Sequence, residues 1–301
     1  MKLVTLGHLL MDISIYVKSY PKPDEASVVG EFRYGGGGSA SNVAVVASRL
    51  GIPTGFIGSI GFDDFGRILL EGLLKEGVDI THVKVVVGEQ SGTSFVIVDE
   101  RGRVMIFEYL GASESIDPSD LDPAYLRRAE FLHITSFRFD VSVSAAKLAK
   151  EGGVKVSFDP GRVEVSKGLK GLSPLLKYCD VVMLNELEVR KLSGVDDLLK
   201  GAGKVMNYGP DTVVVKRGGK GAMVLTKEGK IYSCKAFKVK VVDTTGAGDS
   251  FAGGFLSSLI RGEGLDEALR FANAVAALKV TRRGARSSPT RSEVERFLSE
   301  R

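Results

Sequence analysis

Short apolar runs alternate with longer amphipathic stretches along most of the chain. The apolar runs predict buried strands at residues 2–6, 54–58, 131–135, 154–158, 181–184 and 212–215. Stretches with helical spacing or many small apolar residues predict helices at residues 39–50, 64–76, 141–150, 251–259, 266–282 and 291–301. Because strands that alternate with helices form parallel sheets covered on both faces, the pattern predicts an α/β fold with a central, mainly parallel sheet flanked by helices.

Four further segments alternate between apolar and polar residues and do not fit this strand–helix order. They are residues 13–20, 26–34, 93–99 and 103–110, and the last two are joined by Glu100-Arg101-Gly102. The segments predict a small β-sheet lid inserted at about 13–34 and 93–110 into a single domain of residues 1–301. The exposed edges of such a lid can pair with another copy of the chain, so a homodimer through the lid stays open.

The composition is that of an ordinary soluble globular protein. Of the 301 residues, 44% are hydrophobic and 26% are charged, and the formal net charge is +4. Because this charge is small and the basic residues are scattered, we expect small-molecule partners, no nucleic acid and no membrane. Cys179 and Cys234 are the only cysteines, which argues against a disulfide framework and for the reducing cytoplasm. No signal-peptide core precedes Asp12, and no apolar run reaches the roughly 18–20 residues of a membrane span.

A glycine-rich segment between a predicted strand at 239–242 and the helix at 251–259 carries the clearest candidate chemistry. Its glycines let the backbone turn, so that several amide groups converge at a helix start: Gly246, Ala247, Gly248 and Asp249. Converging N–H donors bind an anion, and the Asp249 carboxylate beside them suits a general base for phosphoryl transfer. An ordinary helix N-terminus with an acidic first turn is the alternative explanation.

Two common nucleotide-binding motifs do not fit the sequence. No Gly-x-x-x-x-Gly-Lys-Ser/Thr segment occurs, so the chain is not a P-loop enzyme. A dinucleotide-binding loop at residues 35–38 is disfavoured, because Ser41 stands where the third glycine belongs. A dinucleotide-dependent oxidoreductase is therefore a distant alternative.

Two long motifs resemble signatures of one enzyme family. The run Asp243-Thr244-Thr245-Gly246-Ala247-Gly248-Asp249-Ser250-Phe251 resembles the C-terminal signature of the ribokinase (PfkB) family of sugar and nucleoside kinases. Upstream, Gly37-Gly38-Ser39-Ala40-Ser41-Asn42-Val43-Ala44 resembles the second signature, with Leu50-Gly51 closing the helix. Weaker similarity extends over nearly the whole chain and looks closest to archaeal-type nucleoside kinases.

The resemblance implies a ribokinase-like fold and a reaction. The reaction is Mg²⁺-dependent phosphoryl transfer from a nucleotide to a hydroxyl of a ribose-containing sugar or nucleoside, under a lid that covers the substrate. Asp249 would be the general base, and the amides of residues 246–249 would form the anion hole. ATP is the expected phosphoryl donor, although the phosphates of ADP would bind to the same backbone amides.

The resemblance also assigns residues to the substrate side. Asp12, just past the carboxyl end of the first predicted strand, would accept hydrogen bonds from substrate hydroxyls. Residues of the second signature would line the same site: Gly37, Gly38 and Asn42. Asp159 and Arg162 follow the strand at 154–158, where the family carries polar residues that vary with the substrate. A turn-capping role is the alternative for Asp12 and Asp159, and a polar first-turn residue is the alternative for Asn42.

Other matches point to the nucleotide side. Asn185 and Glu188 resemble the family's Asn-x-x-Glu motif, which positions Mg²⁺ through water, and their i, i+3 spacing places them on one helix face. Gly218 and Gly221 match a glycine turn that approaches the nucleotide. Lys216 replaces the family's common threonine there, and a lysine can reach a phosphate as a point charge. Solvated helix-surface residues and a plain glycine turn are the alternatives.

The last matches lie near the C-terminus. Asn273 falls where the family often contacts adenine. A monovalent-cation loop, with K⁺ as its ion, is implied for three residues: Asp243, Thr245 and Ala285. A helix end followed by a loop would explain the same residues equally well.

The sequence leaves the substrate open. Arg33, Arg138 and Arg162 lie near predicted substrate-side segments, and such arginines could hold a phosphate or a carboxylate. A kinase of ribose 1-phosphate or of 2-keto-3-deoxygluconate is therefore an alternative to a ribose or nucleoside kinase. A ligand-binding member of the fold without catalysis is a further alternative, and the complete motif around Asp249 argues against it.

Overall fold

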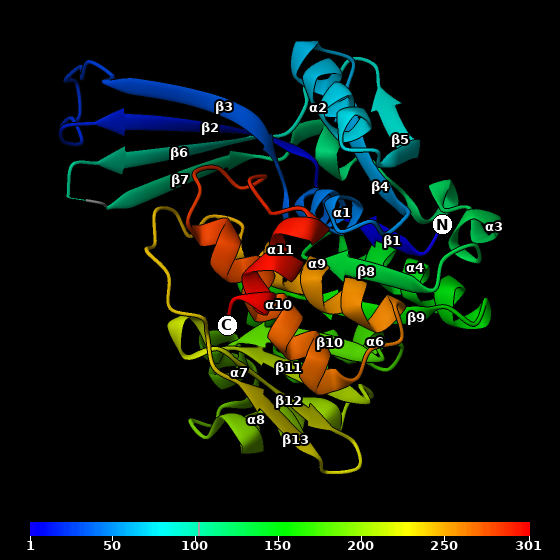
Figure 1. Ribbon diagram of the computed structural model, residues 1–301. Helices are drawn as coiled ribbons and strands as arrows, with labels where there is room; N and C mark the ends of the chain where they lie inside the picture. The colour runs from blue at the N-terminus through cyan, green and yellow to red at the C-terminus, as the bar shows by residue number, and fades with distance from the viewer. Residues whose placement is uncertain (102) are drawn as a thin grey trace.

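The computed structural model describes residues 1–101 and 103–301, and within this part of the chain the strands form a large and a small sheet (Figure 1). The large sheet contains β1 (Leu3–Leu6), β4 (Thr54–Gly61), β5 (Asp79–Val86), β8 (Phe131–Thr135), β9 (Lys155–Asp159), β10 (Val181–Asn185), β11 (Thr212–Lys216), β12 (Ala222–Thr226) and β13 (Ile231–Cys234). Their order in space is β13-β12-β11-β10-β9-β8-β1-β4-β5. Pairing is parallel from β5 to β11 and antiparallel for β12 and β13, which confirms the predicted mainly parallel sheet.

Helices cover both faces of this sheet. One face is covered by α1 (Ser39–Arg49), α9 (Ala247–Ile260) and α10 (Leu265–Val280), with α11 (Arg291–Ser299) packed on α10. The other face carries α3 (Pro123–Leu126), α4 (Phe139–Glu151), α5 (Gly161–Glu164), α6 (Gly168–Leu176), α7 (Glu186–Ser193) and α8 (Leu198–Met206). Helix α2 (Asp64–Lys75) packs on β4 and β5. Short 3₁₀ turns are η1 (Gly111–Glu114), η2 (Pro118–Asp120), η3 (Val165–Lys167) and η4 (Gly218–Lys220).

Strand β10 shows why a continuous apolar run becomes a central strand. Its side chains alternate between the two faces of the sheet, because successive residues of a strand point in opposite directions. Val182 and Leu184 join the core beneath α4, α6, α7 and α8, whereas Val181 and Met183 join the core beneath α1, α9 and α10. Both faces are covered by helices, so residues 181–184 are all apolar, and the usual alternation with polar residues is absent up to Asn185 at the end of the strand.

The small sheet, called the lid sheet here, consists of β3 (Glu31–Gly37), β2 (Leu10–Val17), β6 (Thr93–Asp99) and β7 (Val104–Tyr109), in that order. It projects from one side of the large sheet (Figure 1, upper left). The two predicted β-pairs exist, and they are joined because β2 pairs with β6 in parallel. Gly102, in the predicted turn between β6 and β7, lies outside the described residues.

Two local predictions are wrong. Residues 239–242, predicted as a strand, form no strand, because the chain leaves the sheet edge after β13 and crosses to the end of α10. There the Val242 and Asp243 amides donate to the Val280 carbonyl oxygen at 2.7 and 3.1 Å. Asp12, predicted just past the first strand and ahead of a lid strand that starts at residue 13, lies inside β2, since that strand begins at Leu10.

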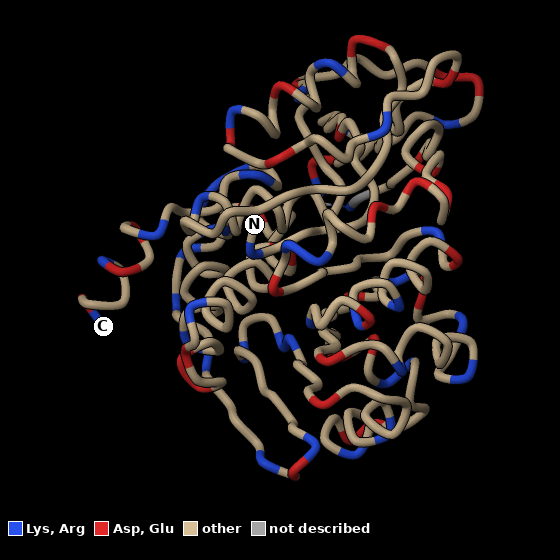
Figure 2. The backbone as a smooth tube through the Cα atoms, turned by 90° about the vertical axis from the view of Figure 1, so that its right-hand side faces the viewer, with Lys and Arg blue, Asp and Glu red and all other residues tan. Residues whose placement is uncertain are grey.

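Charged residues of both signs are interspersed along the backbone (Figure 2). This agrees with the scattered basic residues of the sequence. In the part of the chain that the structure describes, no helix is both long and apolar enough to cross a bilayer.

Candidate active site

Several predicted site residues meet at the carboxyl edge of the large sheet. Asp159, Asn185 and Lys216 are the last residues of β9, β10 and β11, which are neighbours in the sheet. Asp249 lies in the first turn of α9. Ligands bind at this edge in open α/β sheets, because loops and helix N-termini face one another there.

The first turn of α9 depends on Gly246, the N-cap residue. Its φ of 74° lies in the left-handed region, and a Cβ placed there would lie 2.6 Å from the Ala285 carbonyl oxygen. The Ala247 amide donates to the Thr244 carbonyl oxygen at 3.1 Å, so this predicted member of the anion hole is already satisfied. The amides of Gly248 and Asp249 are therefore the first-turn donors that can face a ligand.

The Asp249 carboxylate is tied to α1. Asn42, a buried residue of that helix, donates a hydrogen bond from Nδ2 to Asp249 Oδ2 at 2.8 Å. Burial raises the pKa of Asp249, and the nearby Asp159 carboxylate adds to this, while the Asn42 hydrogen bond and Lys216 oppose it. A carboxylate whose pKa is raised is a stronger base, which suits proton abstraction from an alcohol.

Lys216 and Asp159 form an ion pair beside this turn. Both side chains are largely buried, with 15% and 16% exposed. Burial alone would lower the pKa of Lys216, but the carboxylates of Asp159, Glu188 and Asp249 outweigh it and raise that pKa. A Cβ on Gly248 would lie 3.7 Å from Lys216 Nζ, so the ammonium group stands next to the α9 N-terminus. Asp159, predicted on the substrate side, is thus held by Lys216.

Asn185 and Glu188 cap helix α7. Asn185 Oδ1 accepts from the Glu188 amide at 2.9 Å, and Glu188 Oε2 accepts from the Asn185 amide at 2.8 Å. Asn185 is therefore the N-cap residue and precedes the helix. Glu188 is buried, and burial together with Asp159 raises its pKa.

The carboxylates at this edge fit an ion held through water. The pKa of Lys216 is raised by three carboxylates, those of Asp159, Glu188 and Asp249, so negative groups outnumber the one ammonium group between them. Within residues 1–101 and 103–301, no three acidic, histidine or cysteine side chains converge as a ready-made metal site. An excess of negative charge without convergent ligands suits Mg²⁺, which keeps several waters and binds substrate phosphates.

The predicted substrate residues lie on the lid side of Asp249. The Asp12 carboxylate occupies the space that a side chain on Gly37 would fill, so glycine is required there. Burial raises the pKa of Asp12 to about 7, with contributions from Asp249 and Glu108 and opposition from Arg286. Gly38 is the N-cap of α1, the helix that carries Asn42. The structure thus brings together the predicted Asp12, Gly37, Gly38 and Asn42.

Arg286 is a candidate site residue that the sequence analysis did not assign to the substrate side. It lies in the loop between α10 and α11, at the base of the lid sheet, and donates to Ser41 Oγ at 2.8 Å, Asn42 Oδ1 at 3.3 Å and the Gly37 carbonyl at 3.4 Å. Burial lowers its pKa to about 10, and Asp12 opposes this. In the sequence, Arg282, Arg283 and Arg286 form a local basic cluster that predicts a small anionic ligand such as phosphate, but the cluster does not reveal a contact across more than 240 residues.

Other predicted residues have different surroundings. Arg162 is exposed on α5. Asn273 is buried and donates from Nδ2 to the Cys234 carbonyl at 3.3 Å. Gly221 has a φ of 93° and packs against that same carbonyl, whereas Gly218 faces open space in η4. Asn273 and Gly221 therefore both lie next to the Cys234 carbonyl oxygen, at the end of β13.

Asp243, predicted as a cation ligand, has its carboxylate occupied by backbone amides. Oδ1 accepts from Thr245 and Oδ2 from Gly284, both at 2.8 Å. Burial alone would raise the pKa of Asp243, but these hydrogen bonds outweigh it and lower that pKa. The arrangement joins the loop before α9 to the loop that contains Ala285.

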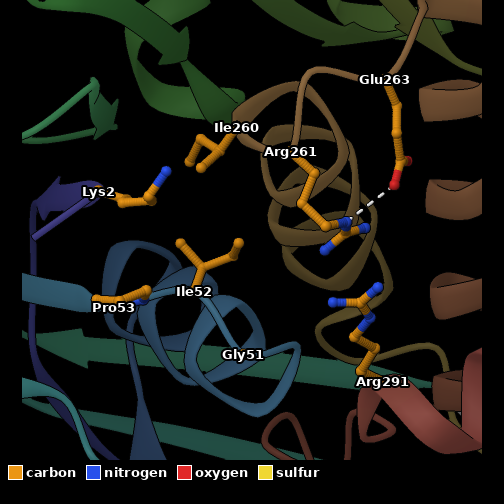
Figure 3. A pocket seen from close by; sticks show the side chains of 8 residues that line it. All are labelled: Lys2, Gly51, Ile52, Pro53, Ile260, Arg261, Glu263 and Arg291. Carbon is orange, nitrogen blue, oxygen red and sulfur yellow. Dashed lines mark hydrogen bonds and ion pairs between the residues drawn. The ribbon is translucent and has the colours of Figure 1, made fainter.

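A cavity of about 510 Å³ lies away from this site, at the amino edge of the sheet (Figure 3). Lys2, Arg261 and Arg291 point into it. Each has a carboxylate partner: Lys2 pairs with Glu130 at 2.8 Å, Arg261 with Glu263 at 2.9 Å and Arg291 with Glu295 at 2.6 Å. None of the predicted site residues lines the cavity, so its size does not make it the candidate active site.

Comparisons with known proteins agree with this geometry. The family described as pfkB family carbohydrate kinase matches residues 1–291. The chain is 37% identical over 300 residues to the ATP-dependent ribose-1-phosphate kinase of Halopiger xanaduensis, covering 100% of this chain and 99% of that protein. It is 34% identical over 310 residues to the ribokinase of Haemophilus influenzae, covering 98% of each. The solved ribokinase structure from Thermotoga maritima is similar, with a TM-score of 0.91, 32% identity and 99% of each chain covered.

A ribokinase structure from Arabidopsis thaliana, complexed with ribose and ATP, matches with a TM-score of 0.89 and 29% identity, covering 99% of this chain and 98% of that one. These similarities confirm the resemblance inferred from the two glycine-rich motifs and the predicted fold. The chain belongs to the pfkB family of carbohydrate kinases, which are phosphotransferases that act on hydroxyl groups.

Proposed function

We propose that this chain transfers the terminal phosphoryl group of ATP to a hydroxyl of a ribose-containing substrate, with Asp249 as general base. The observation that carries the proposal is the position of the Asp249 carboxylate, in the turn that presents the Gly248 and Asp249 amides. A base and an anion hole on one helical turn suit phosphoryl transfer. The base takes the proton of the attacking hydroxyl, while the amides face the phosphoryl group that is transferred.

The surrounding residues support phosphoryl transfer. Lys216, at the α9 N-terminus, adds positive charge where phosphate oxygens would accumulate. Mg²⁺, when bound, would neutralise phosphate charge, and Asn185 and Glu188 would hold its waters. Gly218, Gly221 and Asn273 would lie on the nucleotide side. Asp12 and Asn42 would bind substrate hydroxyls, with the lid sheet excluding water.

A phosphorylated sugar is the second candidate substrate. The Halopiger xanaduensis relative is named a ribose-1-phosphate kinase, and Arg286 lies buried beside the predicted hydroxyl-binding residues. Two of the three arginines first considered for such a role have carboxylate partners: Arg33 pairs with Glu31, and Arg138 with Asp117 and Asp140. The third, Arg162, is exposed on α5. Arg286 is therefore the better candidate for a contact with a substrate anion, because it already faces Asp12 and Asn42.

A phosphotransfer screen with Mg²⁺ separates these candidates. ATP and ADP would each be combined with ribose, several nucleosides, ribose 1-phosphate and 2-keto-3-deoxygluconate, with Asp249→Asn as the control. We expect turnover of a ribose-containing acceptor with ATP, and loss of turnover in the variant. Turnover restricted to ribose 1-phosphate or the acidic sugar would favour the second candidate. No turnover with any pair, or an unaffected variant, would contradict the proposal and favour a ligand-binding protein.

The lid sheet supports a homodimer as the proposed assembly. Apolar side chains on its strands are exposed, with Phe32 at 57%, Tyr34 at 59% and Phe107 at 55%. Light scattering on the purified chain would test this, and a monomer at all concentrations would contradict it. A cytoplasmic location likewise stays a prediction, based on the small number of cysteines.

A further inference from the structure

Lys279 is a fully buried lysine that the proposed reaction does not use. It lies near the end of α10, and its side chain has 0% of its surface exposed. Its Nζ donates a hydrogen bond to the Asp243 carbonyl oxygen at 2.9 Å. Burying an ammonium group is costly unless negative groups surround it. Asp243 and Asp249 are the acidic groups close enough to affect it, and they oppose the lowering of its pKa by burial.

The carbonyl that Lys279 contacts belongs to the loop that leads into the anion hole. The Val242 and Asp243 amides both donate to the Val280 carbonyl of α10. The Asp243 carboxylate accepts from the Thr245 and Gly284 amides. Lys279 therefore adds one more hydrogen bond to the contacts that hold residues 242–246 in place. This segment comes directly before the first-turn donors of α9.

Asp243, one of the three residues predicted as a monovalent-cation site, has hydrogen-bond donors at all of its oxygen atoms. Both carboxylate oxygens of Asp243 accept backbone amides, and the Asp243 carbonyl accepts the Lys279 ammonium. The positive charge that an ion would supply beside Asp243 is already present and covalently attached. Lysine and K⁺ carry the same charge, so one can replace the other beneath the same loop.

We propose that Lys279 is a positioning residue that takes the place of a monovalent cation, holding the loop before α9 and adding positive charge beneath the anion hole. The inference rests on the proposed function, since it concerns the same anion hole. It follows that phosphoryl transfer by this chain does not depend on K⁺.

The test compares cation dependence in the full-length wild-type chain and in Lys279→Met, a variant of similar length without the charge. Activity and the thermal unfolding midpoint would be measured in K⁺ and in tetramethylammonium, which is too large for such a site. Wild type should keep its kcat within about twofold and its midpoint unchanged between the two cations. Lys279→Met should lose about 100-fold in kcat in tetramethylammonium and regain at least tenfold in K⁺, with a raised midpoint. Lys240→Met, an exposed lysine of the preceding segment, is the matched control.

Strong activation and thermal stabilisation of the wild type by K⁺ would overturn the inference. So would a Lys279→Met variant that is fully active without K⁺. If Lys279→Met does not fold, the cation dependence of the wild type still tests the inference. The charge-preserving variant Lys279→Arg should then be as independent of K⁺ as the wild type. If the wild type phosphorylates no acceptor, the proposed function fails, and the unfolding midpoints separately show whether a cation binds.

Discussion

The two ends of helix α9 carry charged residues in different ways. At its N-terminus, Asp159, Glu188 and Asp249 share the ammonium group of Lys216 next to the anion hole. At its C-terminus, Arg261 faces the cavity at the amino edge of the sheet (Figure 3), where each cationic side chain has a carboxylate partner. At the first end the carboxylates outnumber the ammonium group that they share, whereas at the second end each cationic side chain has its own carboxylate partner.

This difference shows that unbalanced, buried charge marks the candidate site better than an open cavity does. The carboxylates of Asp249, Glu188 and Asp12 all have raised pKa values, because each is buried with too little positive charge around it. Such groups are costly for folding and persist where a ligand or a reaction needs them. At the cavity each cationic side chain has a carboxylate partner, although Arg261 Nη1 and Nη2 are buried without a hydrogen-bond partner among the described residues.

The largest expected effect comes from adding one methyl group at each end of α9. Gly246 and Gly262 have φ values of 74° and 84°, so alanine at either position costs about 1 kcal/mol of backbone strain. Only at Gly246 would the new Cβ meet a backbone atom, the Ala285 carbonyl oxygen. We expect kcat to fall by about 10²–10³ for Gly246→Ala and to stay unchanged for Gly262→Ala. Equal losses in the two variants would contradict the assignment of the anion hole.

The next effect concerns the buried ion pair. Lys216→Met should lower kcat by about 100-fold and the free energy of unfolding by about 3 kcal/mol, because Asp159 is left buried without its partner. The double variant Asp159→Asn/Lys216→Met should regain stability but not activity. Lys220→Met, in the same turn with 67% of its side chain exposed, is the control for both assays. Recovery of activity in the double variant would show that Lys216 acts only through Asp159.

A smaller effect is expected from pH. The pKa of Asp12 is about 7 in the folded chain and 3.8 ordinarily, so the folded chain keeps this proton at higher pH. Between these values this residue makes folding less favourable as pH rises, and above pH 7 its carboxylate can accept substrate hydroxyls. Sugar affinity from calorimetry should rise about tenfold from pH 6 to 8 in wild type. A similar rise in Asp12→Asn would contradict the role given to Asp12.

The smallest effect is expected at the opposite end of α9. Arg261 stacks on Phe271 at 4.6 Å and pairs with Glu263, so Arg261→Gln should lower stability by about 1 kcal/mol and leave kcat within twofold. Phosphorylation assays and thermal unfolding would check both values. A loss of activity above tenfold would show that the cavity influences the reaction.

The sequence predicted the elements whose pattern is local. The strand at 181–184 and the helix at 39–50 match β10 and α1 closely, because an apolar run between turn residues has few other structures available. Asp249 and Asn42 were found from two glycine-rich motifs, and the structure joins them by a hydrogen bond across 207 residues.

Long-range contacts could not be predicted in this way. Lys279 lies in an alanine-rich helix, where one lysine looks like an ordinary solvated residue, and its burial depends on the loop at Asp243. Arg286 likewise depends on Ser41 and Asn42. The β-branched residues 239–242 favoured a strand, but after the edge strand β13 the chain turns away to the end of α10.

A crystal structure with a non-hydrolysable ATP analogue, Mg²⁺ and ribose tests the central claim most directly. The account predicts that the terminal phosphoryl group accepts hydrogen bonds from the Gly248 and Asp249 amides, with a ribose hydroxyl between that group and the Asp249 carboxylate. A nucleotide bound in the cavity near Arg261, or with its terminal phosphate away from the α9 N-terminus, would contradict it.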